Sequence, residues 1–215
     1  MIARTGAAAG IVAVLAPVLC VAGVPAPGPI DPLRSGATIS GQGAACQFRF
    51  HAGGDDFNSD ALTVSVTLRD AFDFPVASCS TTVTLAPIGP DTHNFCTCCG
   101  NVQSGFTDAM GTTQFTWDRI GGFGTLVVRV TAHCPGNLAI AELPFDYTSS
   151  DLTGTCDDGS IPVDVLDIAL WARGMSPGEW IHSDWDCSDG SADVIDAGHF
   201  AGGLDDECDD GAPCP

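Results

Sequence analysis

The chain contains no lysine: all seven of its basic residues are arginines, against 27 acidic residues, and its formal net charge is −20. Binding to nucleic acids and to anionic membranes depends on clustered Lys and Arg side chains, and no such cluster is present. We therefore expect neither as a partner. A chain of this composition is better suited to holding hard cations, which bind to carboxylate oxygens.

Common catalytic motifs are also missing. The sequence has no Gly-x-Ser-x-Gly elbow, no His-Glu-x-x-His pair and no phosphate-binding glycine loop. Only two glutamates, Glu142 and Glu179, precede the C-terminal tail, and glycosidases place two carboxylates across a cleft. The sequence therefore predicts a protein that is not an enzyme. A carbohydrate-binding or hydrolytic domain that uses aspartates in turns stays open as an alternative.

The N-terminal segment is typical of an export signal. Arg4 precedes an uncharged apolar run over Gly6–Val21, which is followed by small residues. A membrane anchor is the alternative, but the run is short for a span and contains Pro17. We predict a signal peptide over 1–23, a Pro-rich spacer over 24–36, and a secreted protein without membrane contact after cleavage.

Eleven cysteines are present, and Cys20 leaves with the predicted signal peptide. The remaining ten divide into six and four, and even numbers in an exported chain predict disulfides. The disulfide candidates are Cys46, Cys79, Cys96, Cys98, Cys99, Cys134, Cys156, Cys187, Cys208 and Cys214.

Three groups of these cysteines suggest particular roles. The Cys96–Cys99 cluster could be a zinc knuckle, although zinc sites usually have two such groups. We favour disulfides there, anchoring this loop to the strands that carry Cys46, Cys79 or Cys134. Near the C-terminus, we expect Cys156 to pair with Cys187 and Cys208 with Cys214.

From 37 to 148 the sequence alternates apolar and polar residues with a period of two, as in Val64, Val66 and Leu68. Thr, Val and aromatic residues dominate these runs, as half-buried strands prefer. Turn signals separate the runs, among them the glycine-rich segment Gly121–Gly124. Short strands at such spacing predict an antiparallel β-sandwich, so the expected fold class is mainly β.

Three segments of this region carry a family resemblance: VTLRDAFDFPVASCSTTVTL, GFTDAMGTTQFTW and GGFGTLVVRVTA. They resemble bacterial immunoglobulin-like domains of the invasin type, in which an Asp-rich turn ends in Pro-Val and a later Thr-Asp-x-x-Gly turn enters a strand. The matching residues are Asp70, Pro75, Val76, Thr107, Asp108 and Gly111. The resemblance covers about 90 residues and implies a stalk or adhesion module without catalytic residues.

The part from 149 to 204 is an acidic internal repeat, and an acidic, cysteine-containing tail follows over 205–215. From Asp146 to the end, 17 acidic residues face a single basic one, Arg173. Each copy places an Asp-Gly pair before an Asp-x-x-Asp, and the Asp pairs are 29 residues apart. We expect each copy to be an acidic loop followed by a short helix that starts near the first Asp of its Asp-x-x-Asp.

The acidic loops have features of calcium loops, which need oxygen ligands at alternate positions, a turn glycine and a carboxylate at the twelfth position. In the second copy, Asp189 takes the fifth position, Asp193 the ninth and Asp196 the twelfth. Asp184 and Asp186 take the first and third if Ser188 is an insertion. The first copy can place Asp158, Asp164 and Asp167 similarly, but only with two extra residues over 160–162.

This duplication resembles the dockerin repeat, a pair of EF-hand-related calcium loops each followed by one helix. Carried over by position, the resemblance implies calcium ligands at Asp184, Asp186, Asp189, Asp193 and Asp196, together with the backbone carbonyl of Ser191. It also implies a cohesin-type protein partner, and dockerins are often attached to polysaccharide-degrading enzymes. A structural surface protein with a calcium-stapled spacer, or an acidic linker with solvated carboxylates, are the alternatives.

Tryptophans cluster in the repeat: Trp171, Trp180 and Trp185. They are expected to form the small core of the module or a contact face rather than a platform for a sugar. In the docking interpretation, the helices present a face that includes Trp171 and Phe200 to the partner.

Overall fold

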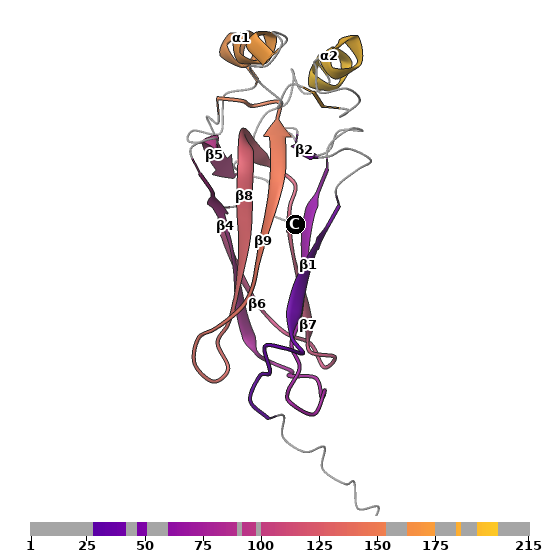
Figure 1. Cartoon of the computed structure of the whole chain (residues 1–215), viewed down its shortest axis with the longest axis vertical. Helices are drawn as coiled ribbons and strands as arrows, with labels where there is room; N and C mark the ends of the chain where they lie inside the picture. Colours follow the sequence, from indigo (N-terminus) through magenta and orange to yellow (C-terminus); the bar gives the residue numbers. More distant parts are fainter. Residues whose placement is uncertain are drawn as a thin grey trace, which may run out of the picture.

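A computed structural model describes the chain over residues 28–41, 47–50, 60–89, 92–97, 100–153, 163–174, 184–185 and 193–201. The predicted signal peptide lies outside these residues. The described part is mainly β, with two short helices at one end (Figure 1). The elements are β1 (Gly36–Ser40), β2 (Phe48–Phe50), β3 (Leu62–Thr67), β4 (Ser80–Pro87), β5 (His93–Thr97), β6 (Val102–Phe106), β7 (Thr112–Trp117), β8 (Ile120–Ala132), β9 (Leu138–Ser149), α1 (Val165–Gly174) and α2 (Val194–Ala201).

The strands form two sheets, which we call together the β body. One sheet has the order β1-β3-β7, and the other has the order β2-β9-β8-β4-β6, with β5 pairing with β8. The pairs are antiparallel, as predicted, except that β2 runs parallel to β9. The prediction was wrong for that pair, because β2 and β9 are distant in sequence and alternation does not reveal strand direction.

Alternating burial explains why these segments are strands. In β3, Leu62, Val64 and Val66 are fully buried and the residues between them are partly exposed. The same alternation continues in β4, and the buried residues of both sheets belong to one apolar core. Fully burying each such aliphatic side chain stabilises the fold by about 1.5–3 kcal/mol. The period-two prediction is confirmed here.

The glycine-rich segment Gly121–Gly124 is not a turn, contrary to the prediction, but part of the long strand β8. A Cβ atom on Gly121 would lie 2.6 Å from the Sγ of Cys96 and 2.7 Å from a carboxylate oxygen of Asp151. The glycine therefore permits neighbouring groups to approach the strand closely, which is a common reason for a glycine within a strand. The sequence shows the glycine but not these neighbours.

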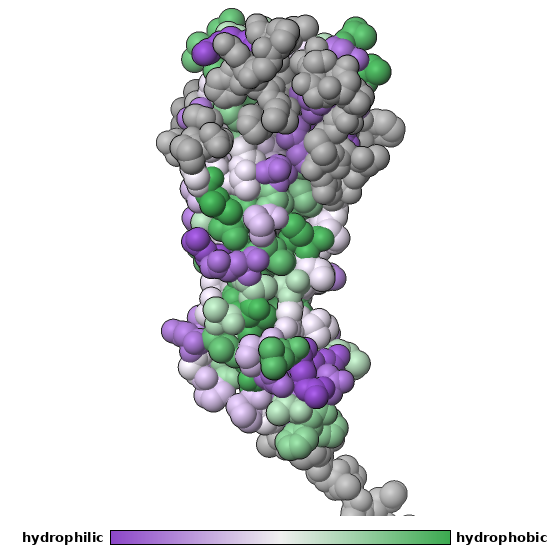
Figure 2. Space-filling model, in the orientation of Figure 1, coloured by the Kyte–Doolittle hydropathy of each residue, from purple (hydrophilic) through white to green (hydrophobic). Residues whose placement is uncertain are grey.

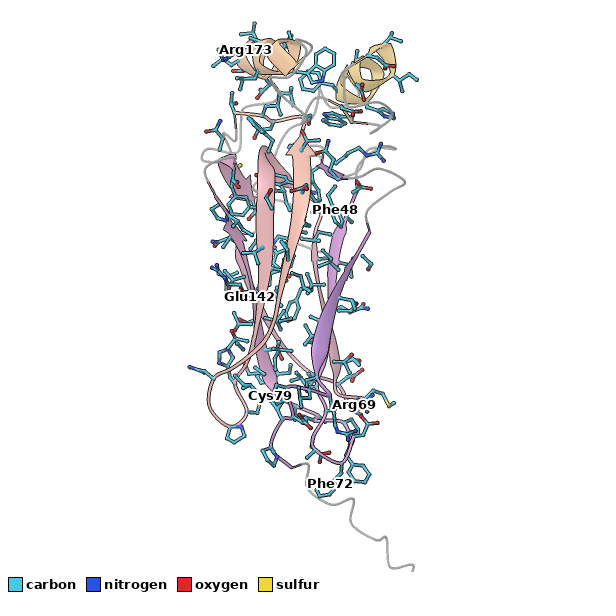
Figure 3. All side chains as sticks on the ribbon, in the orientation of Figure 1. Phe48, Arg69, Phe72, Cys79, Glu142 and Arg173 are labelled. Atoms are coloured by element: carbon cyan, nitrogen blue, oxygen red, sulfur yellow. A yellow bond between two sulfur atoms is a disulfide. The ribbon has the colours of Figure 1, made fainter. Side chains whose placement is uncertain are left out.

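Asp70 organises the loop between β3 and β4, at the end of the molecule away from the helices. Its carboxylate accepts hydrogen bonds from the backbone N–H groups of Gly28 (3.0 Å), Phe72 (2.9 Å) and Phe74 (2.9 Å). These bonds, the one from Gly28 foremost, lower the pKa of Asp70 because they favour the charged form. Phe72 itself is exposed at this tip (Figure 3).

The turn between β6 and β7 lies beside that loop, since the N–H of Leu68 donates to the carbonyl of Gly111 (2.8 Å). Asp108 accepts N–H groups of Thr112 (2.9 Å) and Met110 (2.8 Å), which lower its pKa. Gly111 has φ of 70°, and a Cβ there would lie 2.6 Å from the carbonyl oxygen of Leu68. Asp108 and Gly111 therefore stabilise the shape of this turn.

One disulfide, Cys79–Cys134, joins the start of β4 to the segment after β8, with 5.5 Å between the Cα atoms. Because these two pair with each other, neither can anchor the Cys96–Cys99 loop, and the prediction was wrong on that point. Cys96 is also in a disulfide. The other candidates, Cys46, Cys98, Cys99, Cys156, Cys187, Cys208 and Cys214, lie outside the described residues.

The helices α1 and α2 lie side by side beyond one end of the β body (Figure 1). They begin directly after Asp164 and Asp193, so the predicted helix starts are confirmed. Neither of these helices has the length and apolar character to cross a membrane.

Candidate functional site

The first Asp-x-x-Asp forms a reciprocal cap at the start of α1. The Oδ1 atom of Asp164 accepts the N–H groups of Leu166 (2.6 Å) and Asp167 (3.4 Å). In return, the Oδ2 atom of Asp167 accepts the N–H of Asp164 (2.7 Å). This is the capping-box arrangement, in which the N-cap and N3 residues satisfy backbone donors that a helix start would otherwise leave unpaired.

The second Asp-x-x-Asp repeats this geometry at α2. Asp193 accepts the N–H groups of Ile195 (2.6 Å) and Asp196 (3.4 Å) through its Oδ1 atom. The Oδ2 atom of Asp196 accepts the N–H of Asp193 (2.8 Å). The two copies found in the sequence are therefore also equivalent in local structure. The sequence placed each helix start at the first Asp, but it did not reveal that the second Asp of each pair completes the cap.

Four aspartates in the described part of the repeat are buried, among them Asp151, which is 6 % exposed. Asp167 is 1 % exposed, Asp196 0 % and Asp184 4 %. Burial raises the pKa of Asp167, although N–H groups of Asp164 and Thr153 (2.7 Å each) hydrogen-bond its carboxylate. A buried carboxylate is costly unless a cation or strong hydrogen bonds compensate its charge. Carboxylate oxygens are the ligands that a hard cation such as calcium prefers.

The structure places the candidate ligands only in part. Asp164 and Asp167 lie at the start of α1, and Asp193 and Asp196 at the start of α2. Asp158, Asp186, Asp189 and Ser191 lie outside the described residues. Within the described ranges, no three His, Cys, Asp or Glu side chains come together as a metal site. The calcium loops thus stay predictions.

The two helices pack on each other through equivalent aromatic residues. Trp171 of α1 and Phe200 of α2, which are 29 positions apart like the aspartates, stack with ring centroids 5.3 Å apart. Trp185 meets Phe200 edge-on at 6.2 Å and is fully buried. Trp171 and Phe200 are also buried, so the expectation that they face a partner was wrong: they form the core of the module. Trp180 lies outside the described residues.

This small core extends into the β body. Besides Trp171, Trp185 and Phe200, it contains Phe123 of β8, Leu152 after β9, and Val163. A hydrogen bond links the same two parts: the side-chain amide of Gln47 donates to the carbonyl of Asp184 (3.0 Å). We call these contacts between the helical part and the β body the joint. Because of the joint, the helices pack directly on the end of the β body.

The outward side of the helices carries exposed apolar residues at equivalent positions. Val165 and Leu166 begin α1, and Val194 and Ile195 begin α2. Val165 is 70 % exposed and Val194 is 83 % exposed. Figure 2 shows hydrophobic residues at this end of the molecule, over both helices. We call these four residues the apolar pairs. Large contiguous patches of exposed apolar groups mark interaction sites in soluble proteins, and here the apolar pairs are two smaller groups, one on each helix.

No family model matches this chain, and no curated protein matches it at a significant level.

Proposed function

We propose that the chain is a secreted, non-catalytic modular protein whose C-terminal repeat binds calcium and docks onto a protein partner. In this proposal the β body is an immunoglobulin-like sandwich of the invasin type. The repeat is a dockerin-like module, and its partner is of the cohesin type, in a surface or polysaccharide-degrading assembly.

The observation that carries the docking proposal is the duplication of a surface. Each helix start has the same cap, the same buried aspartate and the same pair of exposed apolar residues, and the two copies are joined through Trp171 and Phe200. Duplicated helices that only filled a core would have no need of matching apolar residues in solvent. Apolar residues within a polar surround are also how many protein interfaces are built.

A bound calcium ion would compensate the negative charge of the buried carboxylates. Asp184, Asp193 and Asp196 would hold an ion together with Asp186, Asp189 and the carbonyl of Ser191. Asp164, Asp167 and Asp158 form the weaker set. Because the unfolded chain has no such site, the binding free energy adds to the stability of the module.

The calcium proposal is tested by calorimetry on the full, oxidised chain. We expect binding heat in the wild type and its loss in Asp189→Ala, which leaves both helix caps intact. Asp73→Ala, in the β3–β4 loop far from the helices, is the matched control and should bind as the wild type does. Absence of heat at millimolar calcium would contradict the proposal.

The docking proposal is tested by capture on an immobilised type I cohesin domain, with calcium or with a chelator. We expect retention only with calcium, and loss of retention when Leu166 and Ile195 are both changed to Asp. These two side chains are exposed, so the double variant should keep its fold, which circular dichroism checks. Equal retention of the variant and the wild type would contradict a role for the apolar pairs.

A further inference from the structure

A network of polar side chains lies on the outer face of the larger sheet, away from the helices. The ring Nδ1 of His133 is 2.6 Å from the Oδ1 atom of Asn137, and its Nε2 is 3.0 Å from the hydroxyl of Thr82. The hydroxyls of Thr82 and Ser104 are 3.0 Å apart. Four side chains from β4, β6 and the β8–β9 turn thus form one continuous chain of hydrogen bonds.

The proton positions in this chain follow from chemistry. The Oδ1 atom of Asn137 can only accept, so Nδ1 of His133 carries a proton, and in the neutral imidazole Nε2 accepts from Thr82. The hydroxyl of Thr82 is then free to accept from Ser104. The side-chain NH₂ of Asn137 and the oxygen of Ser104 stay available at the two ends, and both face solvent. The network therefore offers oriented donors and acceptors to a ligand.

The backbone holds this network in place. The N–H of His133 donates to the carbonyl of Ser80 (2.8 Å), which continues the β4–β8 pairing beyond the end of β8. The next residue, Cys134, is bound to Cys79, which precedes Ser80. Figure 3 shows Cys79 in the half of the molecule opposite the helices. A ligand would therefore meet a surface that is already ordered, which lowers the entropic cost of binding.

An exposed aromatic ring lies beside the polar network. Phe106 is 71 % exposed and pairs directly with Ser80, as Ser104 pairs with Thr82. Residues paired in this way point to the same side of the sheet, so Phe106 shares the outer face with the network. Phe106, Ser80 and His133 lie on successive strands, which sets a width of about 10 Å across the patch.

The patch carries no carboxylate and no arginine. The nearest ion pair on the same face is Arg129 with Glu142 (3.2 Å), and Arg129 pairs with Thr84, the next outward residue of β4 after Thr82. The whole chain is strongly negative, so an anionic ligand is repelled. An exposed apolar ring beside several oriented hydroxyl, amide and imidazole groups matches a ligand with apolar C–H faces and many hydroxyls.

We infer that Phe106, Ser104, Thr82, His133 and Asn137 form a binding site for a neutral oligosaccharide on the β body. The ring of Phe106 stacks on the C–H face of one sugar unit. The amide of Asn137 and the hydroxyl of Ser104 then bond the hydroxyls of that unit and the next. This site is independent of the calcium loops and of the apolar pairs.

The test is calorimetric titration of the full, oxidised chain with three neutral sugars, cellohexaose, xylohexaose and maltohexaose, and with polygalacturonate as an anionic comparison. A chelator is present so that calcium plays no part. The inference concerns the three neutral sugars. We expect at least one of them to bind. Phe106→Ala and Asn137→Ala should each weaken binding about tenfold, because each removes a main contact. Phe72→Ala, which truncates an exposed phenylalanine at the tip, is the matched control and should bind as the wild type does.

Three outcomes would overturn the inference: no binding of any of these sugars at millimolar concentration, equal weakening by Phe72→Ala and Phe106→Ala, or binding of polygalacturonate alone. Asn137 is exposed in a turn, so its variant decides the question if Phe106→Ala does not fold. Loss of calcium binding, by contrast, would leave the sugar result unchanged.

Discussion

Truncation of Phe123 should separate the helices from the β body. Phe123 belongs to β8, but its ring packs in the small core with Trp171, Trp185 and Phe200 rather than in the core of the sheets. Replacing a buried phenylalanine by alanine costs about 3–5 kcal/mol, because apolar contact is lost and a cavity remains. We expect most of this loss to fall on the helices.

Hydrogen exchange with mass spectrometry measures this directly, since it reports the opening free energy of each segment. In Phe123→Ala, amides of α1 and α2 should exchange faster by a factor between about 10² and 10⁴, as follows from that energy. Amides of β3 and β4 should keep their protection. Val128→Ala, whose side chain points into the core of the sheets, is the matched control and should affect the strands.

Two results would refute this reasoning. If Phe123→Ala leaves the exchange of α1 and α2 unchanged, the joint does not stabilise them. If it destabilises β3 and β4 as much as the helices, the joint and the core of the sheets unfold as one unit.

Two further predictions concern the end away from the helices. Gly111→Ala should destabilise the fold by about 1–3 kcal/mol, because a Cβ would meet the carbonyl of Leu68 in a left-handed conformation, and denaturant unfolding measures this. Gly136→Ala is its control, because Gly136 has a similar φ but no atom lies within 4 Å of a Cβ placed there, so this variant should lose less stability. If both variants lose the same stability, backbone strain alone explains the loss and the contact with Leu68 contributes nothing. Because the pKa of Asp70 is lowered, its stabilising effect is present above the ordinary carboxyl pKa and is lost as the pH falls through its folded value. Amide NMR of the β3–β4 loop during acidification should show the hydrogen bonds to Asp70 opening there, and Asp70→Asn should abolish this pH dependence.

Local patterns predicted much of this structure. The strands β3 and β4 follow from alternation, because one face of each is buried and the other is not. Both helix starts follow from aspartates, since a short acidic side chain caps backbone donors wherever the helix lies.

Features that depend on distant partners could not be predicted in this way. Gly121 has the same sequence signature in a turn and in a strand that passes close to Asp151. The direction of Trp171 depends on which side of α1 meets the β body, and that side is set by Phe123, far away in sequence. The strand β6 has no clear alternation of apolar residues, so the polar network around Thr82 and Ser104 was not foreseen.

The parallel pair of β2 and β9 has a consequence for how the chain assembles as it emerges during synthesis. Phe48 pairs with Tyr147, so almost a hundred residues must appear before the second strand reaches the first. Until then, β2 has no neighbour on the side where β9 will lie, and it is open to pairing with another chain. A factor that shields such an edge would therefore act before residue 147 emerges and would leave once β9 is in place.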